Sequence, residues 1–184
     1  MKTRKNLLKA ILGIAFVFGL QSNAQNAVKN EMNFKTANQN IVEFAAASKD
    51  HTTLVAALNA ADLVETLSGT GPFTVFAPTN AAFAKIPKEA LASLLLPENK
   101  EKLQAVLTYH VISGKFDSKA ITEAIKIGSG TATFITAKGE KISGSFEGNK
   151  LVLTDKSGGK SVVTIADLNQ SNGVIHVVDS VLMP

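Results

Sequence analysis

The chain contains no cysteine and no tryptophan, and Arg4 is its only arginine. Without cysteine the protein cannot form disulfides, use a thiol nucleophile, or hold zinc or an iron–sulfur cluster through thiolates. Arginine most often provides the paired hydrogen bonds that grip phosphate and guanine. Because the chain beyond Arg4 has no arginine, we expect no nucleic-acid partner.

Residues 1–24 have the pattern of a secretory signal peptide. Basic residues between Lys2 and Lys9 are followed by an uncharged apolar run from Ala10 to Leu20, and the small residues Ser22 and Ala24 suit the two positions that a signal peptidase reads. The apolar run is about half of the roughly 20 residues that span a bilayer. We therefore expect the protein to be exported to the periplasm, the cell surface or the medium.

The chain after Ala24 has balanced charge and the length of one domain. Four of the 19 basic residues lie in the predicted leader, which leaves 15 lysines against 15 acidic residues. The polar segment 25–38 is expected to be a flexible arm, and residues 39–184 to form one folded domain around a hydrophobic core. No segment after the leader is long and apolar enough to predict a membrane span.

The spacing of apolar residues predicts helices in the first half of the chain and strands in the second. Apolar residues recur at helical spacing from Ile41 to Leu67 and from Leu91 to His110, with one short strand, Phe73–Ala77, between these regions. From Val111 onward the pattern alternates, and turn residues such as Asn172-Gly173 separate the segments. This order indicates an α+β domain. The expected later strands are Thr131–Ala137, Lys141–Phe146, Leu151–Thr154, Val162–Leu168 and Val174–Val178.

Two segments carry more specific patterns. The first, Thr74–Phe83, is a buried strand that ends at a proline, followed by Thr79 or Asn80 as the N-cap of a short helix. The second, Asn172–Pro184, is a turn followed by a buried strand. Between them Tyr109-His110 lies at the end of the last expected helix.

These two segments, with the Tyr-His pair between them, resemble the two signature blocks of the fasciclin (FAS1) domain family. The resemblance covers residues 39–184. It implies a compact wedge of two antiparallel β-sheets with N-terminal helices packed alongside, found in extracellular and surface proteins linked to adhesion. It also implies a structural, non-catalytic role for the positions that define the fold: Thr74, Phe76, Pro78, Thr79, Asn80, Phe83, Tyr109, His110, Gly173, His176 and Asp179.

The three histidines are candidates for a metal or catalytic site. His110 lies on an apolar helical stripe and His176 on an apolar strand face, so both are interpreted as buried residues with hydrogen-bonded rings. His51 is expected to be exposed at a helix start. Asp179 is three residues from His176 on one strand, so the two side chains should point to opposite faces. We therefore predict no metal, no cofactor and no enzyme activity, although a hydrolase using His110 or His176 stays as a minor alternative.

The remaining features of the sequence favour a binding protein. Phe116, Phe134 and Phe146 lie in the strand half, where alternation leaves one face free to expose an apolar contact surface. The first hypothesis is adhesion to an extracellular protein or polysaccharide, and these three phenylalanines are its candidate partner contacts. The alternative is a carrier of an apolar small molecule, such as a pigment or lipid, held in a groove between the sheets of the wedge.

Overall fold

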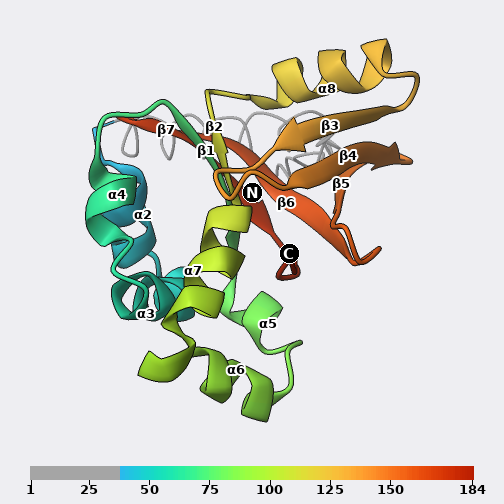
Figure 1. Ribbon diagram of the computed structural model, residues 1–184. Helices are drawn as coiled ribbons and strands as arrows, with labels where there is room; N and C mark the ends of the chain where they lie inside the picture. The colour runs from blue at the N-terminus through green and yellow to red at the C-terminus, as the bar shows by residue number, and fades with distance from the viewer. Residues whose placement is uncertain (1–37) are drawn as a thin grey trace, which may run out of the picture.

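The computed structural model describes residues 38–184, which fold with helices in the first half of the chain and most strands in the second (Figure 1). The predicted signal peptide (residues 1–24) and nearly all of the predicted arm (residues 25–38) lie outside the described residues. Within residues 38–184 no helix is long and apolar enough to cross a membrane.

The helical half begins at a capping box: Asn40 accepts a hydrogen bond from the backbone of Glu43, and the Glu43 carboxylate accepts one from the backbone of Asn40. Thr79 caps the short helix after the first strand by accepting a bond from Ala82 N at 3.2 Å, as one of the two predicted caps. The elements of this half are α2 (Ile41–Ala47), the 3-10 turn η1 (Lys49–His51), α3 (Thr52–Ala60), α4 (Val64–Ser68), α5 (Asn80–Phe83), α6 (Lys88–Leu94), the 3-10 turn η2 (Pro97–Asn99) and α7 (Lys100–Tyr109).

The described strands form one continuous sheet in the order β2-β1-β7-β6-β5-β4-β3. The mixed α+β class is therefore as predicted. In one detail the sheet differs from two purely antiparallel sheets, because β1 and β7 run parallel. About a hundred residues separate these two strands, so no hairpin turn fixes their relative direction. The strands are β1 (Phe73–Pro78), β2 (Val111–Ser113), β3 (Thr131–Ile135), β4 (Lys141–Glu147), β5 (Lys150–Thr154), β6 (Lys160–Gln170) and β7 (Gly173–Val178).

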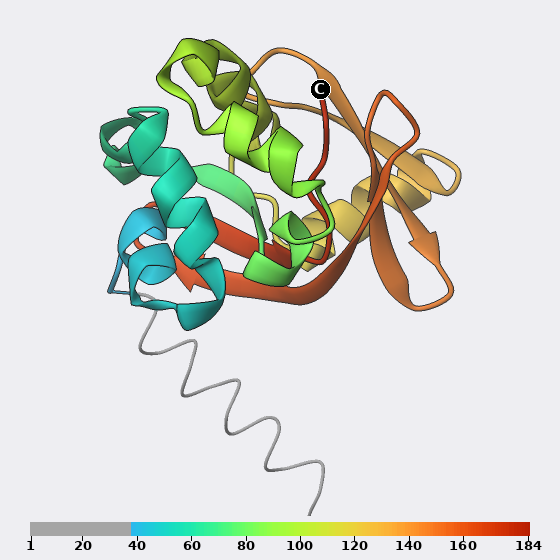
Figure 2. The ribbon, with the colours of Figure 1, turned by 90° about the horizontal axis from the view of Figure 1, so that it is seen from below.

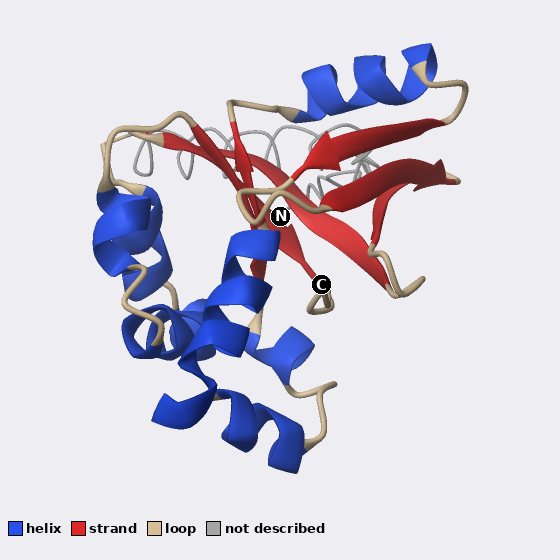
Figure 3. Cartoon of the chain, viewed as in Figure 1, coloured by secondary structure: helices blue, strands red, loops and turns tan. Residues whose placement is uncertain are grey.

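A helix that the alternating pattern did not predict, α8 (Ser118–Ile127), interrupts the strand half. Asp117 caps it by accepting a bond from Ala120 N at 2.8 Å. Only Ile121 and Ile125 on this helix are buried. Because they are four residues apart, they form a single narrow stripe that packs on the sheet. The helix lies alone along β3, while α2 to α7 gather on the other side of the molecule (Figure 3).

The central pair β1–β7 separates two hydrophobic cores. Val75 and Ala77 of β1 face the first core with Ile175 and Val177 of β7, and the helices α2, α3, α4 and α7 cover this side. Phe76 faces the second core, which is enclosed by β3, β4, β5 and α8. Because successive side chains of a strand point to opposite faces of the sheet, β1 contributes side chains to both cores. Every residue of β7 is buried, since both faces are covered. Figure 2 shows the helical layer packed over this central part of the sheet.

The sheet bends back on itself into a wedge. At one end its two outer strands approach each other through an isolated bridge between Ile112 and Thr136, and Ala137 N donates to Val111 O at 2.7 Å. At the other end β5 and β6 pair only where Val152–Thr154 faces Lys160–Val162. Beyond Val162 the strand β6 continues with β7 alone. The wedge is therefore closed at one end and open between β5 and β6 at the other.

Candidate functional site

The polar residues of the first signature segment hold the scaffold together. Thr74 is fully buried, and its hydroxyl donates to Gly114 O at 2.7 Å and accepts from Phe116 N at 2.8 Å. Asn80 joins separate elements, because its side chain accepts from Thr53 N at 2.9 Å and donates to Lys49 O at 2.9 Å. These bonds satisfy the side chains within the protein and tie β1 and α5 to their neighbours.

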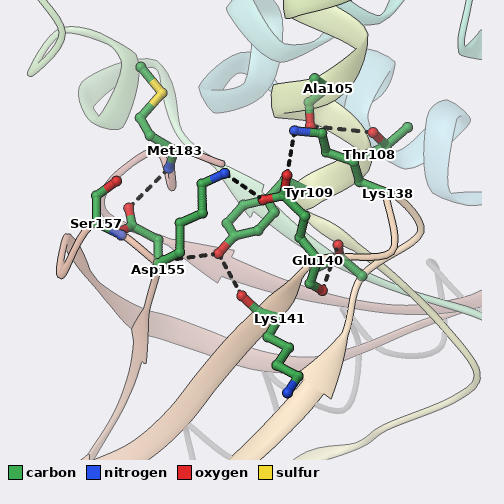
Figure 4. Close-up of polar contacts among 11 residues, drawn as sticks. Ala105, Thr108, Tyr109, Lys138, Glu140, Lys141, Asp155, Ser157 and Met183 are labelled. Atoms are coloured by element: carbon green, nitrogen blue, oxygen red, sulfur yellow. Dashed lines mark hydrogen bonds and ion pairs between the residues drawn. The ribbon is translucent and has the colours of Figure 1, made fainter.

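Tyr109 is a fully buried member of the second core. Its hydroxyl donates to Lys141 O at 2.8 Å and accepts from Lys156 N at 3.2 Å, so the buried ring joins α7 to the start of β4 and to the turn after β5 (Figure 4). Burial raises the pKa of Tyr109, against the effect of the Lys156 amide. Beside it Asp155 accepts bonds from Gly159 N at 2.7 Å and Met183 N at 3.0 Å, which fastens the C-terminal segment.

His110 is a buried, fully hydrogen-bonded residue at the C-cap of α7, as predicted. Its Nδ1 lies 2.7 Å from Val106 O, and its Nε2 accepts a bond from Leu182 N at 3.0 Å. The two contacts require a neutral ring with the proton on Nδ1. Burial lowers the pKa of His110 to about 4, although the bond to Val106 favours the charged form.

His176 uses the opposite tautomer at the centre of β7. Its Nε2 donates to Phe116 O at 2.8 Å, and its Nδ1 accepts from Asp167 N at 3.3 Å. The ring is fully buried and stacks on Phe76 with centroids 5.6 Å apart. Burial lowers the pKa of His176, while the Phe116 carbonyl acts in the other direction. His176 therefore connects the central strands to the segment that leads into α8.

Asp179 lies apart from His176 and has its own partners. It accepts a bond from Val162 N at 2.9 Å and forms an ion pair with Lys85 at 3.3 Å. Burial opposes its ionisation, but the bonds from Val162, Ser180 and Lys85 prevail and lower the pKa of Asp179. Neither ring nitrogen of His176 touches it, so the two do not form a catalytic pair. Within residues 38–184 no three metal-ligating side chains are gathered.

The prediction that His51 is exposed is wrong. His51 is only 4% exposed, and its Nδ1 lies 2.8 Å from Ser48 Oγ. Its ring packs against Phe44 with the two ring centroids 6.1 Å apart. Burial lowers the pKa of His51, although Asp50 acts in the opposite direction. The prediction that a helix starts at His51 is correct, since α3 begins at the next residue. The ring is buried because it contacts α2, and this contact depends on tertiary packing.

Of the three phenylalanines expected to form a contact surface, only Phe146 is exposed. Its side chain is 41% exposed near the end of β4, whereas Phe134 is 6% exposed and lies in the second core. Phe116 packs edge-on against Phe134 with ring centroids 5.5 Å apart. Phe134 is therefore not available to a partner, because its strand position faces α8, the helix that the sequence pattern did not predict.

A groove of about 620 Å³ lies at the open end of the wedge, beside Phe146. Its walls come from four parts of the chain: the first turns of α8, the β4–β5 hairpin, the middle of β6, and Asp179 just after β7. Both apolar and hydrogen-bonding side chains contribute to the lining. The groove is lined by Ser118, Thr122, Phe146, Asn149, Lys150, Leu151, Val162, Val163, Thr164, Ala166 and Asp179.

A bend in β6 holds this groove open. The β6–β7 register shifts twice between Val163 and Leu168, and Asp167 adopts a left-handed backbone with φ 63°. Asp is one of the few residues besides glycine that tolerate this conformation. The Asp167 carboxylate accepts a bond from Ser118 N at 2.7 Å and another from the Ser118 hydroxyl. The bulge and the start of α8 are thus fastened to each other.

Residues 49–184 match the family model of the fasciclin domain. The chain belongs to the fasciclin domain family. The matched range includes both signature segments, the Tyr-His pair and every residue that lines the groove. The fold comparison agrees: a FAS1 domain pair from the insect cell adhesion molecule fasciclin I matches with a TM-score of 0.71 at 18% identity, over 80% of this chain and 52% of that one.

Relatives of this fasciclin domain occur in bacteria and animals. Protein sll1483 of Synechocystis sp. is 48% identical over 78% of this chain and 73% of its own length. The immunogenic protein MPB70 of Mycobacterium bovis is 33% identical over 76% of this chain and 66% of its own. Human periostin is 33% identical over 78% of this chain, which corresponds to 16% of periostin. The domain thus occurs both in short bacterial proteins and as a small part of a long animal protein.

Sequence reasoning found the scaffold of the fasciclin domain but missed most of the groove. Of its lining residues, Phe146 alone was proposed as a partner contact, and Asp179 was named only as a structural position. The one available signal was at α8, where Asp117 and Gly128 bracket the Ile121–Ile125 pair as a cap and a stop would. The bulge at Asp167 has no comparable sequence signature.

Proposed function

We propose that this fasciclin domain is an exported binding module that adheres to an extracellular protein or polysaccharide through the groove between β5, β6 and α8. The single observation that carries the proposal is the groove itself, with exposed Phe146 beside hydrogen-bonding side chains from three elements. A cavity of this size, with an apolar surface and a few polar groups, is typical of a recognition site. The signal-peptide pattern of residues 1–24 supports a location outside the inner membrane.

The arrangement of the histidines supports binding without catalysis. Both ring nitrogens of His110 and of His176 are engaged with backbone groups of the protein. A general base needs a free nitrogen within reach of a substrate proton. We propose that these residues maintain the fold, while partner contact falls on the groove.

The test is capture of the purified domain by intact cells and by extracellular matrix from the native host. Phe146→Ser and Ala166→Gln should each lower capture about tenfold, because one removes the apolar contact and the other fills the groove. Ile127→Ser is the matched control, since Ile127 is 86% exposed and lies outside the groove lining. Equal capture by the wild type and the two groove variants would refute a groove-based function.

A second candidate function is carriage of an apolar small molecule in the same groove. Phe146, Leu151 and Val163 supply the apolar surface that favours it. Protein purified from its native host would be extracted with organic solvent and the extract examined by absorbance and mass spectrometry. A stoichiometric pigment or lipid that is lost in Ala166→Gln would favour the carrier. An empty extract, with groove-dependent capture by cells, would favour adhesion.

A further inference from the structure

Two strand edges face the groove without a strand partner. Lys150 and Leu151 pair with β4, where Leu151 is opposite Phe146, but the pairing of β5 with β6 begins only at Val152. On the other side, Val163 and the residues after it pair with β7 alone. Alternate backbone groups of a strand point to its two edges. The stretch of β6 from Val163 to Ala166 therefore presents backbone donors and acceptors toward the groove.

The open edge of β6 is built into the fold. The bulged part of β6, which shifts register against β7 beyond the last pair with β5, contains Asp167, whose carboxylate binds Ser118 and whose backbone amide binds His176. His176 in turn reaches the Phe116 carbonyl. These bonds fix α8 and β6 relative to each other at one end of the groove. Unpaired strand edges invite another strand, and folded proteins normally cover or charge them. Here the edge is left accessible within a groove.

One charge in the groove is not compensated. Asp179 is paired with Lys85, whereas Lys150 forms no ion pair within the described residues and lines the groove from the β4–β5 hairpin. Glu147, which lies opposite Lys150 on β4, pairs instead with Lys160 at 2.5 Å. The groove therefore presents a net positive charge on the β5 side and favours an acidic group on whatever occupies it.

We propose that the groove binds an extended peptide segment of a partner protein, which adds as a strand to the free edge of β6 from Val163 to Ala166. An acidic side chain of that segment pairs with Lys150, and an apolar side chain rests on Phe146. At about 3.3 Å per residue, the edge accommodates a segment of roughly four residues. The inference rests on the proposed function and specifies it, because main-chain pairing supplies affinity while the charge and the aromatic ring select the sequence.

The experiment starts from a library of random dodecapeptides selected on the immobilised full domain. The best binder is then synthesised, with and without N-methylation at alternate backbone amides. Peptide binding should slow amide hydrogen exchange within Val163–Ala166 by at least about tenfold, and N-methylation at one set of alternate positions should weaken binding about tenfold. Side-chain recognition alone would leave both quantities unchanged and would overturn the proposal.

Two charge-reversal variants test the contact assigned to Lys150. Lys150→Glu should weaken the peptide about fivefold to tenfold and reduce the dependence of affinity on salt, because the reversed charge repels the acidic group. Lys102→Glu is the matched control: Lys102 is exposed on α7, on the helical side of the molecule. Equal effects of the two substitutions would contradict the assigned charge contact.

The outcome also separates this inference from the broader function. If cells capture the domain through the groove but no selected peptide protects Val163–Ala166, the peptide mode is wrong and the binding function stands. The same conclusion follows if capture survives protease treatment of the cells and is lost on digestion of their polysaccharide. If Phe146→Ser and Ala166→Gln leave capture unchanged, the proposed function itself fails.

Discussion

The β1–β7 pair and the groove between β5 and β6 are both places where strands lie next to each other, but they have opposite properties. β1 and β7 pair over their whole length, and β7 is buried at every residue. β5 and β6 pair at three positions and then diverge. The first region contains five of the eleven signature residues, while the groove lining contains only Asp179. The comparison agrees with our proposal that the signature residues maintain the scaffold and that a partner binds at the groove, where few of these residues lie.

The largest effect should come from truncating the ring that belongs to the central pair. Phe76→Ala removes a fully buried side chain that stacks on His176, and it should lower the free energy of unfolding by about 3–5 kcal/mol. Chemical denaturation of the wild type and the variant measures this difference. Phe76→Leu, which retains most of the buried volume, should cost clearly less. Similar losses for the two variants would mean that ring stacking rather than volume dominates the site.

Acid should lower the free energy of unfolding through the buried histidines His110 and His176. Because the pKa of His110 is about 4 in the folded protein and about 6.5 when unfolded, the unfolded state binds more protons between these values. The contribution of His110 to the free energy of unfolding is therefore fully present above pH 6.5. It falls by about 3 kcal/mol as the pH decreases toward 4. His176 has a lowered pKa from burial and contributes loss in the same direction.

The measurement is the free energy of unfolding from pH 7 to pH 5.5, a window that lies above most of the range in which unfolded carboxyl groups, with pKa values of about 4, take up protons. His110→Gln should lower stability at pH 7 but flatten its decline with acid, since glutamine does not titrate. An unchanged slope in this variant would show that His110 is not the residue responsible. Far-ultraviolet circular dichroism at each pH verifies that the folded baseline is retained.

The sequence predicted the central region well for a physical reason. β1 and β7 are buried on both faces, so they read as continuous apolar runs with turn residues at their ends. His110 and His176 could be interpreted as structural from the apolar residues around them. The cap at Thr79 follows from local hydrogen bonding and needs no tertiary information.

The groove could not be predicted in the same way. Its lining residues extend from Ser118 to Asp179 and are brought together only by the fold. The helix α8 was missed because two buried isoleucines give a weak periodic signal among charged neighbours. The bulge at Asp167 depends on bonds to Ser118 and His176, which are 49 and nine residues away. The parallel direction of the β1–β7 pair could not be predicted either, because no local turn connects these two strands.

A smaller effect is expected where the two regions are connected. Asp167→Ala removes the carboxylate that binds Ser118 and places alanine in a left-handed backbone, which should lower stability by about 1–3 kcal/mol. It should also loosen the start of α8, seen as faster amide exchange at Ser118. Asp167→Asn is the control, because asparagine tolerates the same backbone and retains an acceptor. Equal destabilisation by both variants would assign the effect to charge alone.

The smallest effect on stability, and the sharpest contrast with Phe76, is expected at Phe146. Phe146→Ser changes a side chain that is 41% exposed at the mouth of the groove, so the free energy of unfolding should shift by no more than about 0.5 kcal/mol. Capture by cells should nevertheless fall about tenfold, since the substitution removes the apolar contact. Two phenylalanines on strands of one sheet would then have opposite consequences. A large loss of stability at Phe146 would place this ring in the scaffold and move the recognition surface elsewhere.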